Sequence, residues 1–484
     1  MEKLSIETLV LEVEGALLRS SSTFAYFMLV AIEGGGFLRG FLLLLLYPII
    51  CFMGYEFGLR VMVMLCFFGV KTNSFRVGRT VLPKFFLEDM GFEEFELFSK
   101  AKRRVGVTKM PRVMVESFLR DYLGVELVFG RELQEFGGFY TGLTKDDNRR
   151  MEKENVVFKD LVFGKENISG GVMGLCSSST HGRHLVFSQY CKEIYYVGEV
   201  EKRNNRKPVP REKYPKPLIF HDGRLAIRPD PVNAIAIFMW LPFGILLSVL
   251  RLTIAVTLLF YCTIPLAFTG IKWKVRGDAP SSQNLQNSIN HPNTKSAAAA
   301  GQLYICNHKT LLDPNVISLA LNRKASSVSY GLSQFSAMIS PIKINWLTRN
   351  LEEDRKRMER ILSRGEDLVV CAEGTTCREP YLLRFSPLFT ELTDQIVPVA
   401  IDLHVSMFYA TTVSGRKWMD PFYFLMNPYT CYELEFLEKV DTSRVRTSDC
   451  SRFDMANHVQ KQIGKALGFE CTMLRRKDKY MMLA

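Results

Sequence analysis

The sequence predicts a mixed α/β protein with two domains and a membrane-embedded helical hairpin between them. In the first 200 residues, short β-branched runs alternate with helical stretches, and the same alternation returns after residue 300. Two long apolar runs separate these regions. Alternation of strands and helices is typical of a doubly wound sheet. We therefore expect a Rossmann-like N-terminal domain over residues 1–200 and a C-terminal α/β domain over residues 272–484.

An apolar insert interrupts the N-terminal domain at residues 36–70, and its most apolar parts are 42–46 and 61–68. Each part is shorter than the roughly 20 residues that cross a bilayer, and Glu56 and Arg60 interrupt them. We expect an embedded helical hairpin or an apolar cap on the sheet. The strands of the domain are predicted at Thr8–Val13, Arg104–Val107, Val125–Val128 and Ile194–Val197.

A basic, proline-rich linker is predicted at residues 201–230, beside an anionic membrane surface. It leads into a membrane-embedded segment at 231–271, where apolar runs at 232–250 and 252–270 are parted by Arg251. Each run is nearly long enough to span a bilayer. The sequence leaves open whether the runs dip into the membrane as a hairpin or span it, and both readings are favoured over a buried core.

The charge of the chain favours anionic partners. The net charge is +12 and the isoelectric point is about 9.1, which suits phosphate, coenzyme A and acidic lipid headgroups. We expect no nucleic-acid partner, because no nucleic-acid-binding motif accompanies the charge. The eleven cysteines lack C-x-x-C or metal spacing, so we expect reduced thiols in the cytosol and no metal site. No feature of the sequence indicates an oligomeric state.

A histidine and an aspartate near residue 300 are the first candidates for catalysis. His308 follows a short apolar run, and Asp313 comes after four intervening residues, directly before Pro314. The pair would not share a helix face, but a strand-to-helix turn could bring the two side chains together. Asp313 would then act as N-cap and Pro314 as the first helical residue. A carboxylate that orients an imidazole makes the imidazole a general base for an alcohol.

A second strand–turn–helix pattern follows about sixty residues later and predicts an anion site. The apolar run there ends at Glu373 and Gly374, and Thr375 can cap the next helix. Glycine allows a ligand to approach the backbone, and free N–H groups at a helix start attract phosphate. Arg378 and Arg384 could add bidentate donors. Arg349 is another arginine, just after a predicted turn.

The ordered set of motifs resembles a known family. Its members are His308–Asp313, Arg349, Glu373–Thr375 and Val397–Val399, and they resemble the four blocks of the glycerolipid acyltransferases. The strings at 307–314 and 373–380, with the tails at 467–471 and 476–480, are similar to land-plant glycerol-3-phosphate acyltransferases of the cutin and suberin type.

The resemblance implies acyl transfer from acyl-CoA, as co-substrate, to glycerol 3-phosphate, with lysophosphatidic acid as product and acylation at sn-2. It implies no cofactor. It makes His308 and Asp313 catalytic and assigns Arg349, Glu373, Gly374, Thr375 and Arg378 to substrate binding. It also implies an endoplasmic-reticulum protein with a cytosolic active site, or a mitochondrial membrane as for some members.

The same resemblance implies an N-terminal domain of the haloacid-dehalogenase (HAD) type. Phosphatases of that type need an Asp-x-Asp loop after the first strand and further aspartates that hold magnesium. Here Glu12 and Glu14 replace the paired aspartates, and Ser177 and His181 stand where carboxylates should hold the metal. Each added methylene moves a carboxylate by about 1.5 Å, and Mg²⁺ requires carboxylate oxygens in near-octahedral geometry. We expect this domain to be inactive as a phosphatase.

Three other functions stay open from the sequence. The first is a bifunctional acyltransferase and phosphatase that releases monoacylglycerol. The second is acylation of lysophosphatidic acid instead of glycerol 3-phosphate. The third is a catalytically silent membrane scaffold, against which the intact His308, Asp313 and Glu373 argue.

Overall fold

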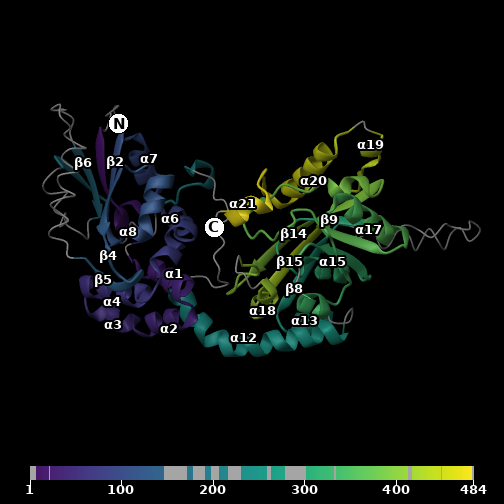
Figure 1. Ribbon diagram of the computed structural model, residues 1–484, viewed down its shortest axis with the longest axis horizontal. Coiled ribbons are helices and arrows are strands. Elements are labelled where there is room, and N and C mark those ends of the chain that lie inside the picture. Colours follow the sequence, from purple (N-terminus) through teal and green to yellow (C-terminus); the bar gives the residue numbers. More distant parts are fainter. Residues whose placement is uncertain are drawn as a thin grey trace, which may run out of the picture. The chain divides into compact units, whose positions relative to one another are not determined.

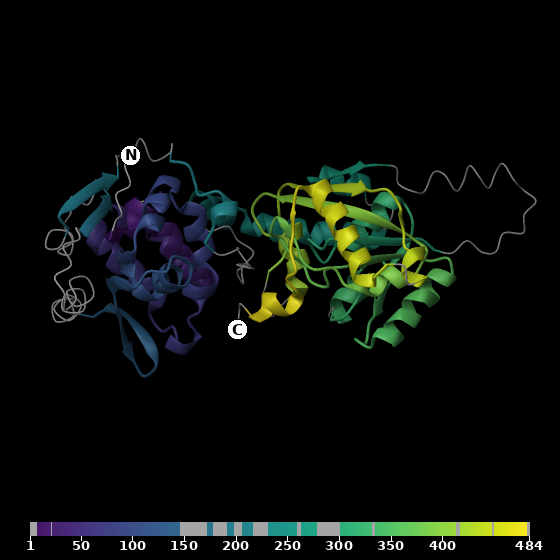
Figure 2. The ribbon, with the colours of Figure 1, turned by 90° about the horizontal axis from the view of Figure 1, so that it is seen from above.

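The computed structural model describes the chain in two compact units (Figures 1 and 2). They comprise Met1–Gly223 with Pro229–Ile235, and Arg224–Arg228 with Ala236–Ala484. The described residues are 7–20, 22–145, 172–177, 191–197, 206–215, 231–258, 263–277, 301–331, 334–412, 417–447 and 450–481.

A five-stranded parallel sheet forms the centre of the first unit (Figure 1). Its strands lie in the order β3 (Leu127–Arg131), β2 (Arg103–Pro111), β1 (Thr8–Glu12), β6 (Val172–Ser177) and β7 (Glu193–Val197). Its helices include α1 (Phe24–Gly35), α5 (Val77–Thr80), α6 (Leu82–Asp89), α7 (Phe92–Lys100) and α8 (Arg112–Ser117). A hairpin of β4 (Leu133–Phe136) and β5 (Phe139–Thr144) was not expected from the sequence. The predicted Rossmann-like sheet is confirmed.

The apolar insert folds as three short helices, not as a two-helix hairpin. They are α2 (Phe37–Leu45), α3 (Tyr47–Phe52) and α4 (Tyr55–Phe67). Gly54 separates the last two, and its φ of 77° lies in the left-handed region that glycine favours. The helices bury one side each, at residues such as Leu43, Ile50 and Leu59.

An eight-stranded mixed sheet organises the second unit. Its main path runs β11 (Ile344–Trp346), β10 (Ala325–Ser329), β12 (Asp367–Cys371), β9 (Leu303–Cys306), β14 (Gln395–Val405), β15 (Thr430–Phe436) and β8 (Ile271–Arg276), and β16 (Val440–Asp441) pairs with β14. The first five strands are mutually parallel. A separate pair joins β13 (Tyr381–Leu382) to β17 (Glu470–Cys471).

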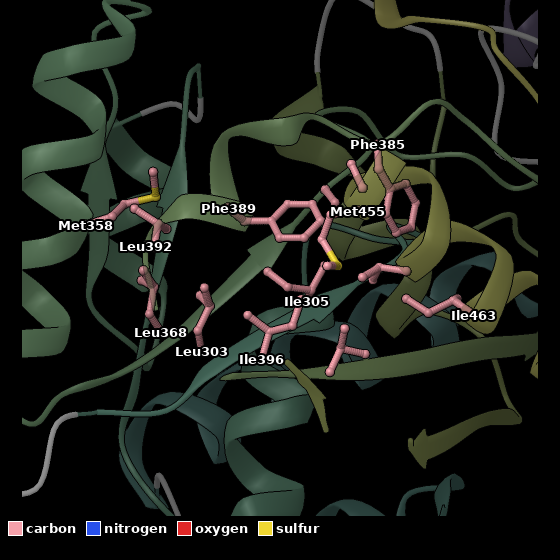
Figure 3. Close-up of a cluster of buried hydrophobic side chains, with 14 of the residues drawn as sticks. Leu303, Ile305, Met358, Leu368, Phe385, Phe389, Leu392, Ile396, Met455 and Ile463 are labelled. Atoms are coloured by element: carbon pink, nitrogen blue, oxygen red, sulfur yellow. The ribbon is translucent and has the colours of Figure 1, made fainter. Parts of the chain in front are cut away.

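Helices cover both faces of this sheet. They are α13 (Thr263–Phe268), α15 (Asp313–Leu321), α16 (Gln334–Ile339), α17 (Leu351–Ser363), α18 (Asp420–Leu425), α19 (Ser443–Arg446), α20 (Arg452–Leu467) and α21 (Arg476–Met481). Alternate side chains of β9 enter two cores, as strand geometry requires. Tyr304 packs with α13, α15 and α18, whereas Ile305 packs with α17 and α20 (Figure 3). Figure 2 shows α20, in yellow, over one face of the strands.

The predicted helix break at Arg251 is wrong. Helix α12 (Pro231–Leu258) runs through Arg251 without interruption, and of the second apolar run only the end of α12 and the six residues of α13 are described as helix. The Arg251 side chain is completely buried. Its guanidinium donates hydrogen bonds of 2.6 Å to the carbonyl oxygens of Leu425 and Asn427, and another to that of Thr269. The guanidinium of Arg251 is therefore paired inside the second unit, so the helix can continue through this residue.

Helix α12 is also the one helix in the described part of the chain that is long and apolar enough to cross a membrane. The stretch Ile235–Thr257 meets this criterion by length and composition, and 22% of its most apolar window is buried. Within the predicted linker, Arg206 donates to the carbonyl of Ala16 and pairs with Glu94 at 2.8 Å. Residues 201–205 and 216–230 of that linker lie outside the described residues.

We predict that Arg251→Met weakens the second unit. Buried carbonyls would lose a charged donor, and such a hydrogen bond contributes about 1.5–3 kcal/mol. A total loss of about 3 kcal/mol would lower the unfolding midpoint by about 6–12 °C. Thermal unfolding in detergent measures this, with Arg276→Met on exposed Arg276 as control. An unchanged midpoint would contradict the bracing role of Arg251.

Candidate active site

The pairing of two strands brings the two sequence motifs together. Strands β9 and β12 are parallel neighbours, and Cys306 lies opposite Cys371 in the register. His308 and Glu373 each follow two residues later, at the carboxyl edge of the sheet where loops of α/β proteins form binding sites. The strand pairing thus places the two motifs side by side.

Glu373 joins the two loops through backbone hydrogen bonds. Its Oε1 accepts the N–H of His308 at 2.7 Å, and its Oε2 accepts the N–H of Leu383 at 2.9 Å. The N–H of Cys377 donates to the carbonyl of His308 at 2.7 Å. Burial raises the pKa of Glu373 to about 7, while the backbone donors oppose that shift. Glu373 thus braces the His308 loop, and its expected contact with glycerol stays a prediction.

The predicted contact between His308 and Asp313 is confirmed. The ring Nδ1 lies 3.0 Å from Asp313 Oδ2. The same oxygen accepts the N–H groups of Lys309 at 2.6 Å and Thr310 at 2.9 Å, and Oδ1 accepts the Thr310 hydroxyl at 2.9 Å. Asp313 is fully buried at the first residue of α15. A neutral ring that donates from Nδ1 to this carboxylate keeps the Nε2 lone pair for a proton from substrate.

The Cys371 sulfur lies beside the ring, within 4.8 Å of the donor atoms of His308 and Asp313. Burial opposes protonation of His308, but the Cys371 thiolate and the Asp313 hydrogen bond outweigh it and raise the His308 pKa to about 10. A hydrogen bond with Cys306, whose Sγ is 3.6 Å away, stabilises the thiolate against burial, and the imidazolium adds to this. The Cys371 pKa falls to about 6. The two groups therefore titrate as a coupled pair.

These three side chains also have the donor types of a metal site. The ligand atoms of His308, Asp313 and Cys371 lie within 4.8 Å of one another, which makes them a candidate set among the described residues. Asp313 already accepts several hydrogen bonds from its own loop. The arrangement fits a proton relay through the ring better than an additional ligand on this carboxylate.

Two cavities adjoin the His308 loop. One, of about 120 Å³, is lined by His308, Gly374, Cys371 and Ser386 among others. The other, of about 150 Å³, is almost wholly apolar, and its wall includes Trp273, Phe422 and Leu312. Leu311 and Ile344 line both cavities. The loop thus lies between a mixed cavity and an apolar one.

The remaining predicted binding residues differ in whether they line the His308 cavity. Gly374 lines the His308 cavity with a φ of 68°, and Thr375 is buried next to it. Arg349 is exposed after β11 and has a φ of 69°, a strained conformation for a residue other than glycine. The Arg378 guanidinium lies 4.0 Å from the ring centroid of Tyr409. Among the residues that the structure describes, neither arginine belongs to the walls of the two cavities.

The sequence did not indicate two residues that support the site. The Tyr432 hydroxyl, on β15, lies 2.7 Å from the Thr310 hydroxyl and donates to Asp313 Oδ1 at 3.4 Å. The Lys309 ammonium donates to the carbonyl of Glu379 at 3.0 Å. Lys309 lies inside the motif and could have been singled out, whereas no local signal identifies Tyr432.

A second site, in the first unit, holds the degenerate phosphatase residues. Glu14 Oε1 accepts the Thr108 hydroxyl at 2.5 Å and the N–H groups of Lys109 and Met110 at 3.0 and 2.9 Å. Glu12 pairs with the Lys109 ammonium at 3.1 Å and accepts the N–H of Ser177 at 2.9 Å. Burial raises the pKa of Glu14, while the hydrogen bond from Thr108 opposes the shift.

The predicted positions Glu12, Glu14 and Ser177 therefore do lie together. His181 lies outside the described residues. Both carboxylates accept donors of the protein itself, and the Glu14 side chain fills the space in front of the Thr108 hydroxyl.

Comparisons with known proteins identify both domains. A family model described as the HAD-like domain of RAM2-like glycerol-3-phosphate acyltransferase matches residues 8–197, and an acyltransferase model matches residues 283–402. The chain is 49% identical to probable glycerol-3-phosphate acyltransferase 3 of Arabidopsis thaliana, over 99% of this chain and 90% of the relative. It is 39% identical to glycerol-3-phosphate acyltransferase RAM2 of Petunia hybrida, over 97% of this chain and 96% of the relative. The chain therefore belongs to the glycerol-3-phosphate acyltransferase family, with a HAD-like domain followed by an acyltransferase domain.

Proposed function

We propose that this glycerol-3-phosphate acyltransferase takes the acyl group from acyl-CoA, transfers it to the sn-2 hydroxyl of glycerol 3-phosphate, and releases lysophosphatidic acid with its phosphate intact. The observation that carries the proposal is the 3.0 Å contact between His308 Nδ1 and the buried Asp313 carboxylate. It leaves Nε2 as the base, and His308 forms part of the wall of a cavity.

The reaction then needs no covalent enzyme intermediate. His308 Nε2 removes the proton of the glycerol hydroxyl as its oxygen attacks the thioester carbonyl. The tetrahedral intermediate collapses, the carbon–sulfur bond breaks, and the imidazolium returns the proton to the coenzyme A thiolate. Asp313 stabilises the imidazolium while it exists.

The apolar cavity supports the proposal that the acyl donor carries a fatty acyl chain. Its walls come from α12, α13, β8, α15 and α18, and they include Leu252, Trp273 and Phe422. Leu311 lines both this cavity and the His308 cavity. An acyl chain in the apolar cavity would place its thioester at the boundary, near the histidine.

Glycerol 3-phosphate would occupy the His308 cavity. The Gly374 backbone lies open to a ligand there, because no atom lies within 4 Å of the position that a Cβ would take. We assign Arg349, Arg378, Thr375 and Glu373 to this substrate as the family resemblance implies. The net charge of +12 favours both anionic substrates.

The proposal that the phosphate is kept rests on Glu14. In its position the carboxylate takes the Thr108 hydroxyl and two backbone N–H groups, which are the donors a phosphate would need. A negatively charged phosphate would have to displace a buried carboxylate there.

Helix α12 supports membrane attachment of the enzyme. Its apolar side chains, such as Met239, Phe243 and Leu246, are 64–73% exposed. We propose the endoplasmic reticulum with a cytosolic active site, and the mitochondrial membrane as the alternative location.

His308→Ala is predicted to lower acyl transfer by about 10²–10⁴-fold, because it removes the general base. Radiolabelled glycerol 3-phosphate and a panel of acyl-CoAs give the rate. Mass spectrometry of the product identifies its acyl position. The matched control is His404→Ala, since His404 is a mostly exposed histidine on β14. Full activity in a folded His308→Ala enzyme would refute the mechanism.

Cys371→Ser is predicted to shift the pH profile. The base acts in its unprotonated form, so kcat/KM rises with pH through the His308 pKa. Removal of the thiolate withdraws a charge that favours the imidazolium, which lowers the His308 pKa. The rising limb should therefore move to lower pH. Cys471→Ser is the control, and a Cys371→Ser profile identical to that of the parent enzyme would speak against the thiolate–imidazolium pair.

The product of the full-length enzyme is predicted to be lysophosphatidic acid even after long incubation with Mg²⁺. The double variant Glu12→Asp and Glu14→Asp should also release no phosphate, because Ser177 still replaces a metal ligand. A colorimetric phosphate assay with lysophosphatidic acid measures this, and a competent HAD phosphatase serves as positive control. Monoacylglycerol formed by the parent enzyme would establish the bifunctional alternative.

A further inference from the structure

The insert of the first unit exposes a large apolar face. We define the insert face as the outward side chains of α2, α3 and α4. On it, Phe52 is 93% exposed, Leu38 72%, Leu45 61% and Ile49 52%. Figure 1 shows α2 and α3 in a row along one edge of this unit, next to α4. Contiguous apolar patches of this kind on soluble proteins mark interaction sites.

The opposite side of the same helices explains why this face points outward. Leu43 and Leu59 are fully buried, and Gly40 lies so close to Ile32 of α1 that a Cβ there would meet its side chain at 2.5 Å. Arg39 donates 2.9 Å hydrogen bonds to the carbonyl oxygens of Cys66, in the last turn of α4, and of Phe68, directly after it. The insert is thus fixed on the unit by one side, and its exposed side chains are not an unfolded core.

The backbone of the insert suits a lipid environment. Hydrocarbon tolerates backbone groups only if they are paired, and helices pair their own. The helices have 9, 6 and 13 residues, so they are about 14, 9 and 20 Å long. None reaches the roughly 30 Å of a bilayer core. They can lie in the plane of the interface but cannot span it.

The charges and aromatic rings at the insert fit the same surroundings. Glu56, the acidic residue of α4, is neutralised by Arg131 at 2.5 Å. Arg60 and Lys71 are exposed cations, which complement anionic lipid headgroups. Tyr55 is 45% exposed, and tyrosines are enriched at the depth of the headgroups.

We propose that the insert face is a bilayer-docking surface, which lies in the headgroup–acyl boundary of a phospholipid membrane and gives the HAD-like unit its own membrane contact. This contact is separate from α12, the helix on which the proposed membrane attachment rests. The degenerate phosphatase fold would then carry a lipid-binding surface in place of its former chemistry.

The test uses the full-length enzyme in vesicles of phosphatidylcholine and phosphatidylserine. A fluorescent amino acid replaces Phe52 in one protein, Leu246 of α12 in a second and Tyr195 of β7 in a third. Leu246 is 70% exposed and Tyr195 51%. Lipids with brominated acyl chains should quench the label at 52 and the label at 246 severalfold more than the label at 195.

The positive control at 246 separates this proposal from the attachment by α12. Quenching at 246 without quenching at 52 overturns docking by the insert face and leaves the attachment by α12 intact. Quenching at 52 without quenching at 246 supports docking by the face and refutes attachment by α12.

A double variant, Leu38→Glu with Leu45→Glu, tests the surface without the label at 246. Both side chains are exposed, so circular dichroism should be unchanged, while quenching at position 52 should fall to the level at 195. Cross-linking in detergent tests a rival occupant. Concentration-dependent cross-links between two copies through position 52, with no lipid quenching, would overturn the proposal in favour of self-association.

Discussion

The hydrogen bonds of one buried carboxylate with two loops are the constraint on which the acyltransferase site depends. Glu373 accepts N–H groups from His308 and from Leu383, and parallel pairing of β9 with β12 determines which residues can meet there. A shift of the register by one residue would turn alternate side chains of β9 into the wrong core. The position of the His308 ring is therefore coupled to the packing of both faces of the sheet. Catalysis needs this rigidity, because a displacement of about 1 Å can reduce a rate about a hundredfold.

Buried glutamates with backbone donors occur in both units, with opposite consequences. In the second unit Glu373 holds a loop so that His308 stays open to a cavity. In the first unit Glu14 takes the hydroxyl of Thr108 and two neighbouring amides, so the donors that would serve a phosphate are satisfied internally. Unsatisfied buried donors would cost about 1–3 kcal/mol each. A glutamate at position 14 can thus stabilise the fold of this unit by accepting these hydrogen bonds.

The sequence predicted what depends on short-range patterns and missed what depends on long-range contacts. The turn that brings His308 to Asp313 could be foreseen from the strand, the spacing and Pro314. The role of Arg251 could not. A lone cation in an apolar run usually marks a helix end, but here distant carbonyls of Leu425 and Asn427 satisfy it within a continuous helix. Tyr432 was missed for the same reason, since it approaches Asp313 from a strand 119 residues away.

The polar and apolar residues of the His308–Asp313 loop correspond to the two cavities that the loop adjoins. The loop is polar at its ends, where His308 contacts Asp313, and apolar in the middle, where Leu311 and Leu312 line the apolar cavity. A thioester has the same division, with a polar carbonyl next to a long apolar chain. If the chain occupies the apolar cavity, the carbonyl comes to the boundary that Leu311 forms between the two cavities. Burial of the chain would then contribute about 0.8 kcal/mol per methylene, and it would position the carbonyl toward the histidine. Selection for acyl chains and orientation for attack would thus depend on the same few residues.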